Sequence, residues 1–539
     1  MPKKTQNSDE QPPVVKKQSL VRSGINLSIL TLISRVLGLA REMIKAAFLG
    51  TSALGDAFGI AFKIPNLFRR LFAENSVSVA FIPTFQKYLK TKTKQETKKF
   101  VNATLTLVTF AVAIVVILGM IFSPWLVRIF AGKEHASVMG EMTLLTRIMF
   151  PYLLVISIAA FFQGVLNGIK IFSPSGFTPI LFNLCVIGGT FALTPFVANP
   201  ARAMAIGVLV GGIVQASFQL PYVVKNGWPL HFTKLKTAFS NEGTRTVLRL
   251  IGPTIIGMAA YQLNDLVSTA LAGHAGIGYA SSLDYSLRLQ ELILGIFVVS
   301  IGTVILPDLS GMAQKKDWPQ FNELLSNALC IVTLISIPVT VFSLITGENI
   351  IRLIFQTHNF NENSVALTTP IFKFHILGLL FIALNRILAP AFYAQGNTKL
   401  PTIAGILGVI VNLITACILV IPFKGAGIAL ALTIASFVNT VFLIILLGKI
   451  GTINVSSILN RTLQYSIKMI IFSIIAATPI YFLHDTIFSW FSIGNRIIDQ
   501  GIPLIICGII FAVIGIFLLF LTRDSILSSI VKKIHPHRN

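Results

Sequence analysis

Residues 34–42 read SRVLGLARE and begin the stretch, residues 34–75, around which the chain is organised. The stretch forms two strongly apolar helical segments separated by a short break at residues 50–52. Nine charged residues, six of them basic, lie in it: Arg35, Arg41, Glu42, Lys45, Asp56, Lys63, Arg69, Arg70 and Glu74. A charged side chain near the bilayer centre costs about 2.5 to 3.5 kcal/mol even on the lenient insertion scale. We therefore expect these charges to face water, one another or an anionic ligand.

Composition places the chain among membrane proteins. Hydrophobic residues make up 54% of the 539 residues and charged residues only 12%, and the mean hydropathy is +0.79, as in polytopic membrane proteins. The formal net charge of +23 comes from basic residues in short loops between apolar runs, as the positive-inside rule expects, so no nucleic-acid partner is predicted. The four cysteines lie within apolar runs without paired spacing and predict neither a disulfide nor a metal site.

The apolar runs predict an all-α polytopic membrane protein with about fourteen transmembrane helices of about 20 residues each. The expected spans are residues 25–49, 56–85, 101–122, 142–168, 176–196, 203–223, 246–272, 279–306, 321–346, 366–394, 400–421, 426–447, 463–483 and 501–521. Basic residues gather in one set of alternate loops. With an even number of spans both terminal tails belong to that set, so we expect both termini to be cytoplasmic.

An internal repeat, at an offset of about 224 residues, is indicated by short matches such as FIPTF (81–85) with ILPDL (305–309). Two six-helix halves of the same orientation would be related by an axis along the membrane normal, with a site between them near the midplane. The predicted division is a disordered cytoplasmic tail (1–23), an N-lobe with helices 1–6 (24–223), a cytoplasmic linker (224–245), a C-lobe with helices 7–12 (246–447), helices 13–14 (448–522) and a cytoplasmic tail (523–539).

The charges in the first two helices follow helical spacing. Arg35 and Glu42 lie on one face two turns apart, and Arg70 and Glu74 share a face beyond Pro65, which bends the second helix. One explanation is a ladder of internal ion pairs made by these two couples. Three basic groups remain after every acid is paired, however, which favours a basic cavity over a closed ladder.

A third charged cluster, Asp284, Arg288 and Glu291, occupies one face of the eighth expected helix. It could be a self-neutralising triplet, or Arg288 could face the arginines of the first half across a gap between the repeats. Guanidinium groups bind phosphate through a planar fork, so several of them around one cavity suit a pyrophosphate better than a cationic drug or a neutral sugar.

Three further intramembrane polar residues, Asp265, Asn412 and Thr433, allow two interpretations. They could supply oxygen ligands to a monovalent cation, or each could make a hydrogen bond between helices, which we favour. The sequence contains no Gly-x-x-x-x-Gly-Lys-Ser/Thr loop, so ATP hydrolysis by this chain is not expected. Beyond that cation, no cofactor is predicted.

A series of motifs runs along the chain in order. It begins with residues 34–42, DAF (56–58), FKIPNLFRR (62–70) and FAE (72–74), and continues with QGVLN (163–167), residues 285–291 around Arg288, and PAFYA (390–394). With this series the chain resembles the MurJ (MviN) family of lipid II flippases, most densely over the first two expected spans.

The resemblance implies a transporter, not an enzyme, of the multidrug/oligosaccharidyl-lipid/polysaccharide exporter superfamily, with two pseudo-symmetric lobes and alternating access. Its substrate would be lipid II, the undecaprenyl-diphosphate-linked disaccharide-pentapeptide of peptidoglycan biosynthesis, carried across the bacterial cytoplasmic (inner) membrane by a monomer surrounded by membrane lipids. Carried over by motif, the substrate-binding arginines are Arg35, Arg41, Arg69 and Arg288. The cavity or gate residues are Glu42, Asp56, Lys63, Arg70, Glu74 and Glu291.

The resemblance leaves three questions open. Helices 13–14 would form a hydrophobic groove for the polyprenyl tail, or would be a plain anchoring hairpin. Asp265 would be one carboxylate of a cation site, but Ala416 occupies the turn after Asn412, which leaves sodium coupling open. The alternative functions are a flippase for another polyprenyl-diphosphate-linked glycan and a cation-coupled multidrug antiporter of the same superfamily, which would need a net-acidic cavity.

Overall fold

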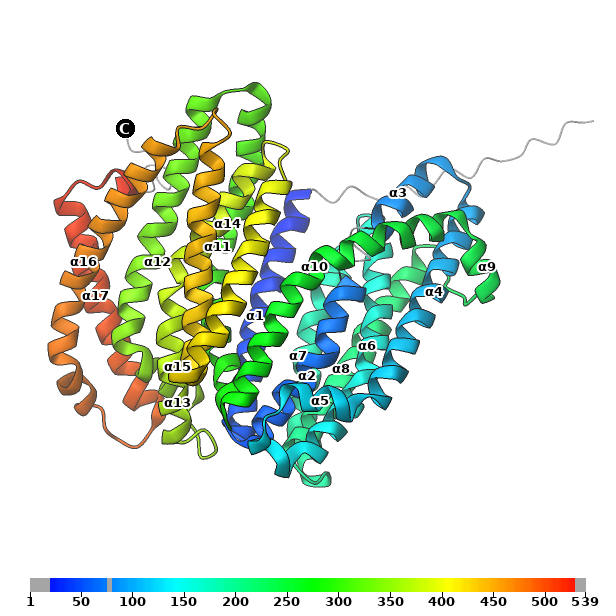
Figure 1. Cartoon of the computed structure of the whole chain (residues 1–539), viewed down its shortest axis with the longest axis horizontal. Coiled ribbons are helices and arrows are strands. Elements are labelled where there is room, and N and C mark those ends of the chain that lie inside the picture. The colour runs from blue at the N-terminus through cyan, green and yellow to red at the C-terminus, as the bar shows by residue number, and fades with distance from the viewer. Residues whose placement is uncertain (1–19, 75–79, 529–539) are drawn as a thin grey trace, which may run out of the picture.

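The computed structural model describes residues 20–74 and 80–528, and in this part of the chain it contains helices and no strands (Figure 1). The elements of the first half are α1 (Leu20–Leu49), α2 (Ala53–Phe68), the π-helix η1 (Arg69–Glu74), α3 (Ile82–Thr91), α4 (Lys94–Ile121), α5 (Ser123–Phe130), η3 (Lys133–Val138), α6 (Met139–Gly168), α7 (Ser173–Leu193), η4 (Thr194–Phe196), α8 (Pro200–Lys225) and α9 (Leu235–Ser240). The second half contains α10 (Glu242–Ala275), α11 (Tyr279–Lys315), α12 (Trp318–Phe355), α13 (Glu362–Leu377), α14 (Leu379–Tyr393), α15 (Lys399–Gly448), α16 (Val455–Ser489), the π-helix η5 (Ile497–Gly501) and α17 (Ile502–Leu521).

The predicted fold class is confirmed, and each expected span overlaps a helix. Nine helices of the described residues are long and apolar enough to cross a membrane. Two expected spans, 400–421 and 426–447, are merged in α15, where Lys424 breaks the helix with φ 50° and ψ −129°. The span expected at 366–394 is divided into α13 and α14.

The predicted tails lie mostly outside the described residues. Residues 1–19 and 529–539 are not described, and α1 already begins at Leu20, inside the tail expected for 1–23. In Figure 1 the first and last described helices have their outer ends on the same, upper side of the molecule. The loops around α3 and α9, which carry many of the basic residues, lie on that side as well.

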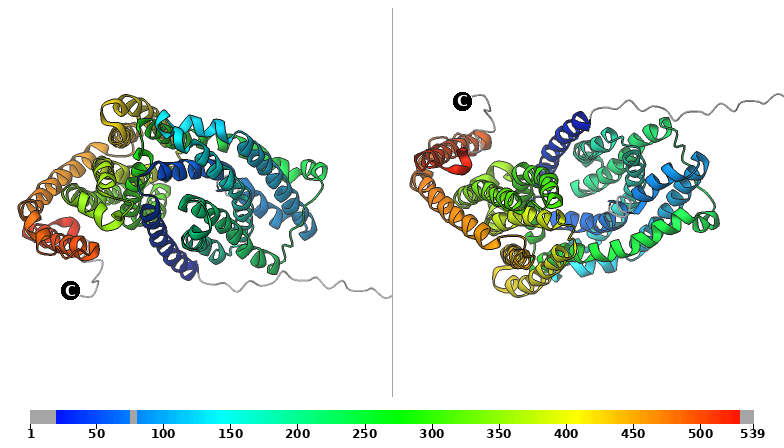
Figure 2. Two further views of the ribbon diagram at one scale, coloured as in Figure 1. Left: turned by 90° about the horizontal axis from the view of Figure 1, so that it is seen from below. Right: turned by 90° about the horizontal axis from the view of Figure 1, so that it is seen from above.

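The helices form two bundles with α1 and α10 between them (Figures 1 and 2). The two halves pack in the same pattern: α1 packs against α7 and α2 against α6, while α10 packs against α15 and α11 against α13. Each bundle has its own hydrophobic core, one centred on residues such as Phe81 and Phe161, the other on Phe321 and Phe372. We refer to the two bundles as the N-lobe and the C-lobe.

Side-chain caps determine where many helices begin, because the first backbone N–H groups of a helix have no partner inside it. Ser52 accepts a hydrogen bond from Gly55 at the start of α2, and Asn361 accepts one from Ser364 at the start of α13. At α4, Thr93 and Glu96 form a complete capping box. These polar residues interrupt apolar sequence and thereby set the ends of the membrane-crossing helices.

Helices α16 and α17 extend the C-lobe outward and pack against α12. Lys468 of α16 forms an ion pair of 2.7 Å with Asp524, which follows α17 and also accepts hydrogen bonds from the backbone of Ile526 and Leu527. Burial opposes ionisation of Asp524, but the hydrogen bonds from Lys468 and Leu527 outweigh it and hold the pKa of this carboxyl below its usual value. The pair therefore fastens the end of α17 to α16.

We predict that Lys468→Ala lowers the thermal unfolding temperature at neutral pH, because a hydrogen bond between charged groups contributes about 1.5 to 3 kcal/mol. Since the folded-state pKa of Asp524 is lowered, its contribution is present above the ordinary pKa of about 4 and is lost as the pH falls through the lowered value. The difference from wild type should therefore shrink in acid. Lys449→Ala, at an exposed lysine, is the control; equal unfolding temperatures for the two variants would contradict the assignment.

Candidate functional site

The two lobes meet at a polar seal around Asp56, near the start of α2. Asp56 is fully buried and accepts hydrogen bonds from the backbone N–H of Gly278 (2.6 Å) and Ser281 (2.8 Å) and from the Ser281 hydroxyl (2.7 Å). The imidazole Nε2 of His135 lies 3.0 Å from the same carboxylate. Gly278 is the N-cap of α11, so an N-lobe carboxylate caps a C-lobe helix, where the helix dipole favours negative charge.

The hairpin between α1 and α2 adds further contacts to the seal. The Tyr285 hydroxyl donates to the Gly50 carbonyl (3.0 Å), and Asn359 donates to the Ala47 carbonyl (2.8 Å). Gly50 has φ +56°, and a Cβ there would collide with the Asn359 backbone, so only glycine fits this close approach. The seal lies at the end of the molecule opposite the described termini, at the bottom of Figure 1.

A layer of partly buried ion pairs follows the seal and lines a chamber of about 90 Å³. Lys63 of α2 contacts Asp284 at 2.8 Å and Asp265 at 3.5 Å, and donates to the Thr269 hydroxyl at 2.7 Å. Lys45 of α1 lies 3.7 Å from Asp284. Asp284 therefore pairs with two N-lobe lysines. Arg288 still pairs with Glu291 at 2.9 Å, so the self-neutralising triplet considered for these three residues is only partly formed.

Glu42 is the acid of α1 and is only 6% exposed. Its carboxylate lies 2.7 Å from Arg41, 3.6 Å from Lys45 and 3.8 Å from Arg288 of the C-lobe. The couple of Glu42 with Arg35, considered from the two-turn spacing as part of an ion-pair ladder, is therefore not formed. Because Glu42 is paired with these closer bases, Arg35 has no carboxylate partner among the described residues.

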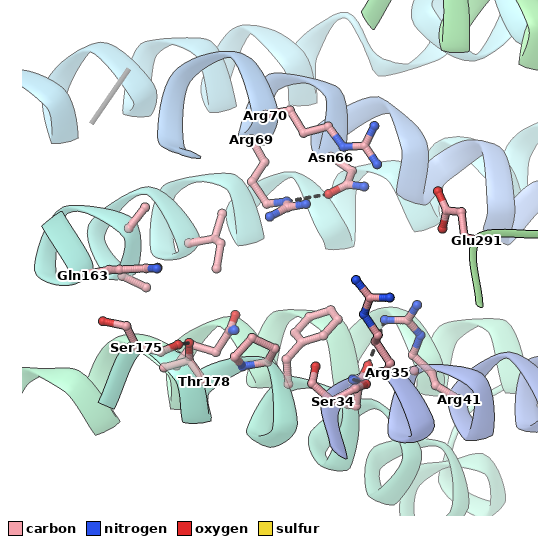
Figure 3. A pocket seen from close by; sticks show the side chains of 18 of the residues that line it. Ser34, Arg35, Arg41, Asn66, Arg69, Arg70, Gln163, Ser175, Thr178 and Glu291 are labelled. Carbon is pink, nitrogen blue, oxygen red and sulfur yellow. Dashed lines mark hydrogen bonds between the residues drawn. The ribbon is translucent and has the colours of Figure 1, made fainter. Parts of the chain in front are cut away.

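A larger cavity of about 590 Å³ lies beyond the ion-pair layer, and its lining is strongly basic (Figure 3). Among the described residues that line it, Glu291 is the only acid. The lining arginines are Arg35, Arg41, Arg69, Arg70, Arg288 and Arg386. All four arginines predicted to bind substrate are brought together here. Arg386 of α14 joins them, although it was not among the arginines predicted to bind substrate.

Neutral side chains hold several of these arginines in place. Arg69 donates to Asn66 at 2.6 Å, and Arg41 donates to Asn183 of α7 at 3.1 Å. The guanidinium of Arg35 lies over Gly295 of α11, in the space that a Cβ at that position would need. The arginines thus point into the cavity with their guanidinium groups oriented before any ligand is bound.

Arg69 and Arg70 are consecutive in sequence, yet both line the cavity. They begin the π-helix η1, which follows α2 four residues after Pro65, and π segments often occur at functional sites. Arg70 also lies 3.8 Å from Asp265 of α10. The couple expected between Arg70 and Glu74 is not described, because the side chain of Glu74 lies outside the described residues.

Comparisons with known proteins identify the family of the chain. The sequence model of the family described as "Lipid II flippase MurJ" matches residues 45–497. The chain belongs to the MurJ family of lipid II flippases. A "Probable lipid II flippase MurJ" of Treponema pallidum (strain Nichols) is 47% identical over 514 residues, which are 94% of this chain and 97% of that protein. The "Lipid II flippase MurJ" of Burkholderia cenocepacia is 32% identical over 438 residues, 80% of this chain and 84% of that protein.

Solved structures support the same family. One described as "Lipid II flippase MurJ, inward closed conformation" has a TM-score of 0.76 and 26% identity, and covers 93% of this chain and 99% of that chain. An inward-facing MATE multidrug transporter of the MOP superfamily, with 14% identity and a TM-score of 0.64 over 81% of this chain and 99% of that chain, shares the fold. The chain is therefore a multi-pass transporter of the bacterial inner membrane, not an enzyme.

The three intramembrane polar residues considered as cation ligands make separate contacts in this structure. Asp265 is paired with Lys63 and Arg70, as described above. Asn412 donates to Asn264 at 2.7 Å, and Thr433 donates to the Phe374 carbonyl at 2.7 Å. The three residues thus do not present a shared set of oxygen ligands, and no cation step enters the function proposed below. Cation coupling stays a prediction.

We predict that Asp56→Ala opens the seal. Each hydrogen bond to a charged group contributes about 1.5 to 3 kcal/mol, so the loss of even one changes the closed-to-open ratio by about tenfold or more. A cysteine placed at Leu287, which lines the small chamber, should then react at least about tenfold faster with an impermeant maleimide added from the sealed side. The four native cysteines are removed first.

The matched control for this seal prediction is Ser52→Ala, since Ser52 caps α2 within the N-lobe and makes no bridge to the C-lobe in the described contacts. It should leave the labelling rate unchanged. Equal rates for Asp56→Ala and wild type would show that the seal does not depend on this carboxylate.

We predict that Gly295→Ala weakens pyrophosphate binding, because the new methyl group displaces the Arg35 guanidinium. Loss of one charge-assisted hydrogen bond corresponds to a fall in affinity of about tenfold or more, measured by titration calorimetry on the purified chain. Gly311→Ala in the same helix, where a Cβ meets nothing within 4 Å, should bind as wild type does. Wild-type affinity in the Gly295→Ala variant would show that Arg35 does not take part in pyrophosphate binding.

Proposed function

We propose that this protein moves lipid II, the undecaprenyl-diphosphate-linked disaccharide-pentapeptide, from the cytoplasmic to the outer leaflet of the inner membrane. The observation that carries the proposal is the convergence of six arginines on one cavity between two lobes, in a chain that belongs to the MurJ family. A diphosphate carries the clustered charge that such a set of guanidinium groups binds through paired hydrogen bonds.

The geometry favours loading from the side of the termini. The seal and the ion-pair layer join the lobes at the opposite end, so the large cavity lies on the terminal side of both barriers. We propose that this side is cytoplasmic, with both termini there, and that a single chain performs the transport. Arg35, Arg41, Arg69 and Arg288 would hold the diphosphate, with Arg70 and Glu291 beside them.

Transport then requires the lobes to close the end that is open and to open the end that is sealed. Rocking of the lobes separates Asp56 from α11 and Lys63 from Asp284, which opens the sealed end while the other end closes. The polyprenyl tail would remain in lipid along α16 and α17, whose outer faces carry exposed side chains such as Ile471 and Ile505. No covalent step is needed, since the chain only has to bind, enclose and release.

The membrane potential would help to return the empty transporter. An inside-negative potential acts on a charge at about 2.3 kcal/mol per 100 mV. The empty cavity has six arginines and one glutamate in its described lining, so the potential favours the state in which this charge faces the cytoplasm. Bound diphosphate offsets that charge and makes outward movement easier.

The two alternative functions differ in the ligand that the cavity must accept. A multidrug antiporter for cations would need acids where this cavity has arginines. A flippase for another polyprenyl-diphosphate-linked glycan would use the same arginines, so the experiment has to distinguish the lipid-linked substrates themselves.

We predict that cells depleted of this protein lose outward exposure of lipid II, scored with an external enzyme that cleaves only exposed lipid II. The wild-type chain should restore exposure, whereas Arg288→Ala should reduce it at least about tenfold, since hydrogen bonds from a charged group contribute about 1.5 to 3 kcal/mol each. Arg461→Ala, at an arginine that contacts Asn327 outside the cavity, is the matched control. If lipid II stays exposed after depletion, with no other flippase present, the substrate of this protein would be a different anionic lipid.

A further inference from the structure

The large cavity has two chemically different walls. Every charged residue of its described lining comes from α1, η1, α11 or α14. The described lining residues of α6, α7 and α8 carry no charge, and they include Gln163, Ser175, Thr178, Gln215 and Gln219. Figure 3 shows the separation: Gln163, Ser175 and Thr178 lie at one end of the view, and Arg35, Arg41 and Glu291 at the other. We call the α6–α8 side the neutral wall.

The neutral wall contains buried amides that the protein does not satisfy. The side-chain oxygens of Gln215 and Gln219 accept no hydrogen bond within the described part of the chain, although these residues are only 7% and 1% exposed. The amide nitrogen of Gln219 donates hydrogen bonds to the backbone carbonyls of Ala159 and Gln215. Buried polar groups in native proteins are normally paired, so two unpaired amide oxygens in a cavity wall indicate a ligand with hydrogen-bond donors.

The same wall offers flat apolar surface beside these amides. Tyr152 and Phe182 both line the cavity, with ring centres 5.6 Å apart. Gly211 and Gly212 of α8 make room for them, because a Cβ at either position would press on one of the two rings. Ligand sites that combine aromatic faces with a few neutral polar groups suit uncharged polar ligands.

We propose that the neutral wall binds the uncharged, acetamido-bearing sugars of the substrate, while the arginines hold its diphosphate. This inference rests on the proposed function and extends it, since it gives the glycan a defined place in the cavity. Sugar hydroxyl and acetamido N–H groups would donate to Gln215 once a rotation of its amide turns the oxygen toward the cavity, while the amide nitrogen of Gln219 stays bonded to the carbonyls of Ala159 and Gln215. Free carboxylates of the peptide would be drawn to the arginines instead, which leaves the neutral wall to the sugars.

The test measures dissociation constants of the full chain, in detergent, for three probes: undecaprenyl diphosphate, the same lipid carrying the disaccharide alone, and the complete lipid with disaccharide and pentapeptide. Gln215→Leu should weaken both glycosylated probes by about two- to tenfold, the loss expected for one neutral hydrogen bond. It should leave undecaprenyl diphosphate unchanged. Arg69→Ala should weaken all three probes.

A second variant guards against a folding defect. Gln163→Leu changes an exposed cavity residue and should show the same selectivity as Gln215→Leu without lowering the thermal unfolding temperature. Gln464→Leu, on the exposed face of α16 and paired only with Asn460 among the described contacts, should bind all probes as wild type does.

Three outcomes would overturn the sugar assignment. Equal weakening of all three probes by both glutamine variants would mean that the wall only shapes the cavity, and no effect on any probe would mean that the amides do not touch substrate. Weakening of the complete lipid alone would assign the wall to the peptide. If the wild-type chain binds none of the three probes, the proposed function fails as well, which separates the two failures.

Discussion

The structure depends on one carboxylate that is buried between two lobes. Asp56 has no exposure to solvent, and its partners among the described residues are the start of α11 and His135. Removing its partners while it stays buried would leave a charge that costs several kcal/mol. The Asp56 carboxylate is therefore stable either with all its protein partners or fully exposed to water, and intermediate separations of the lobes are unfavourable. A transporter that must never be open at both ends benefits from such an all-or-none contact.

The ion-pair layer and the cavity extend the same constraint inward. Lys63 and Asp284 belong to different lobes, so any motion that opens the seal also separates these charges. Water entering from the sealed side can hydrate them at that moment. On the other side of the layer, the arginines repel one another until an anion arrives, so ligand binding removes an electrostatic obstacle to closing the lobes around it.

The sequence predicted the helices and the cavity arginines because both follow from the cost of exposing polar groups to lipid. It did not predict the pairing. Helical spacing compares residues of one helix, so the only partner it offered Glu42 was Arg35, in a ladder that we did not favour. In the folded chain Glu42 is satisfied by Arg41, Lys45 and Arg288. Asp56 was predicted as a cavity or gate residue through the family resemblance, but its partners were not predicted. Two of its donors are backbone N–H groups at the start of α11, which no side-chain pattern reveals. The two glycines at 276 and 278, between α10 and α11, mark this helix start in the sequence.

The hairpin at Gly50 gives α1 the properties of a lever. It is fixed to the C-lobe through Tyr285 and Asn359, while the shaft of α1 lies against α7. At 1.5 Å per residue, Lys45 is about 7 Å from this pivot and Arg35 about 22 Å. A swing of about 10° would move Lys45 by about 1 Å but Arg35 by about 4 Å. A small rotation at the sealed end thus produces a larger displacement at the far end of the cavity.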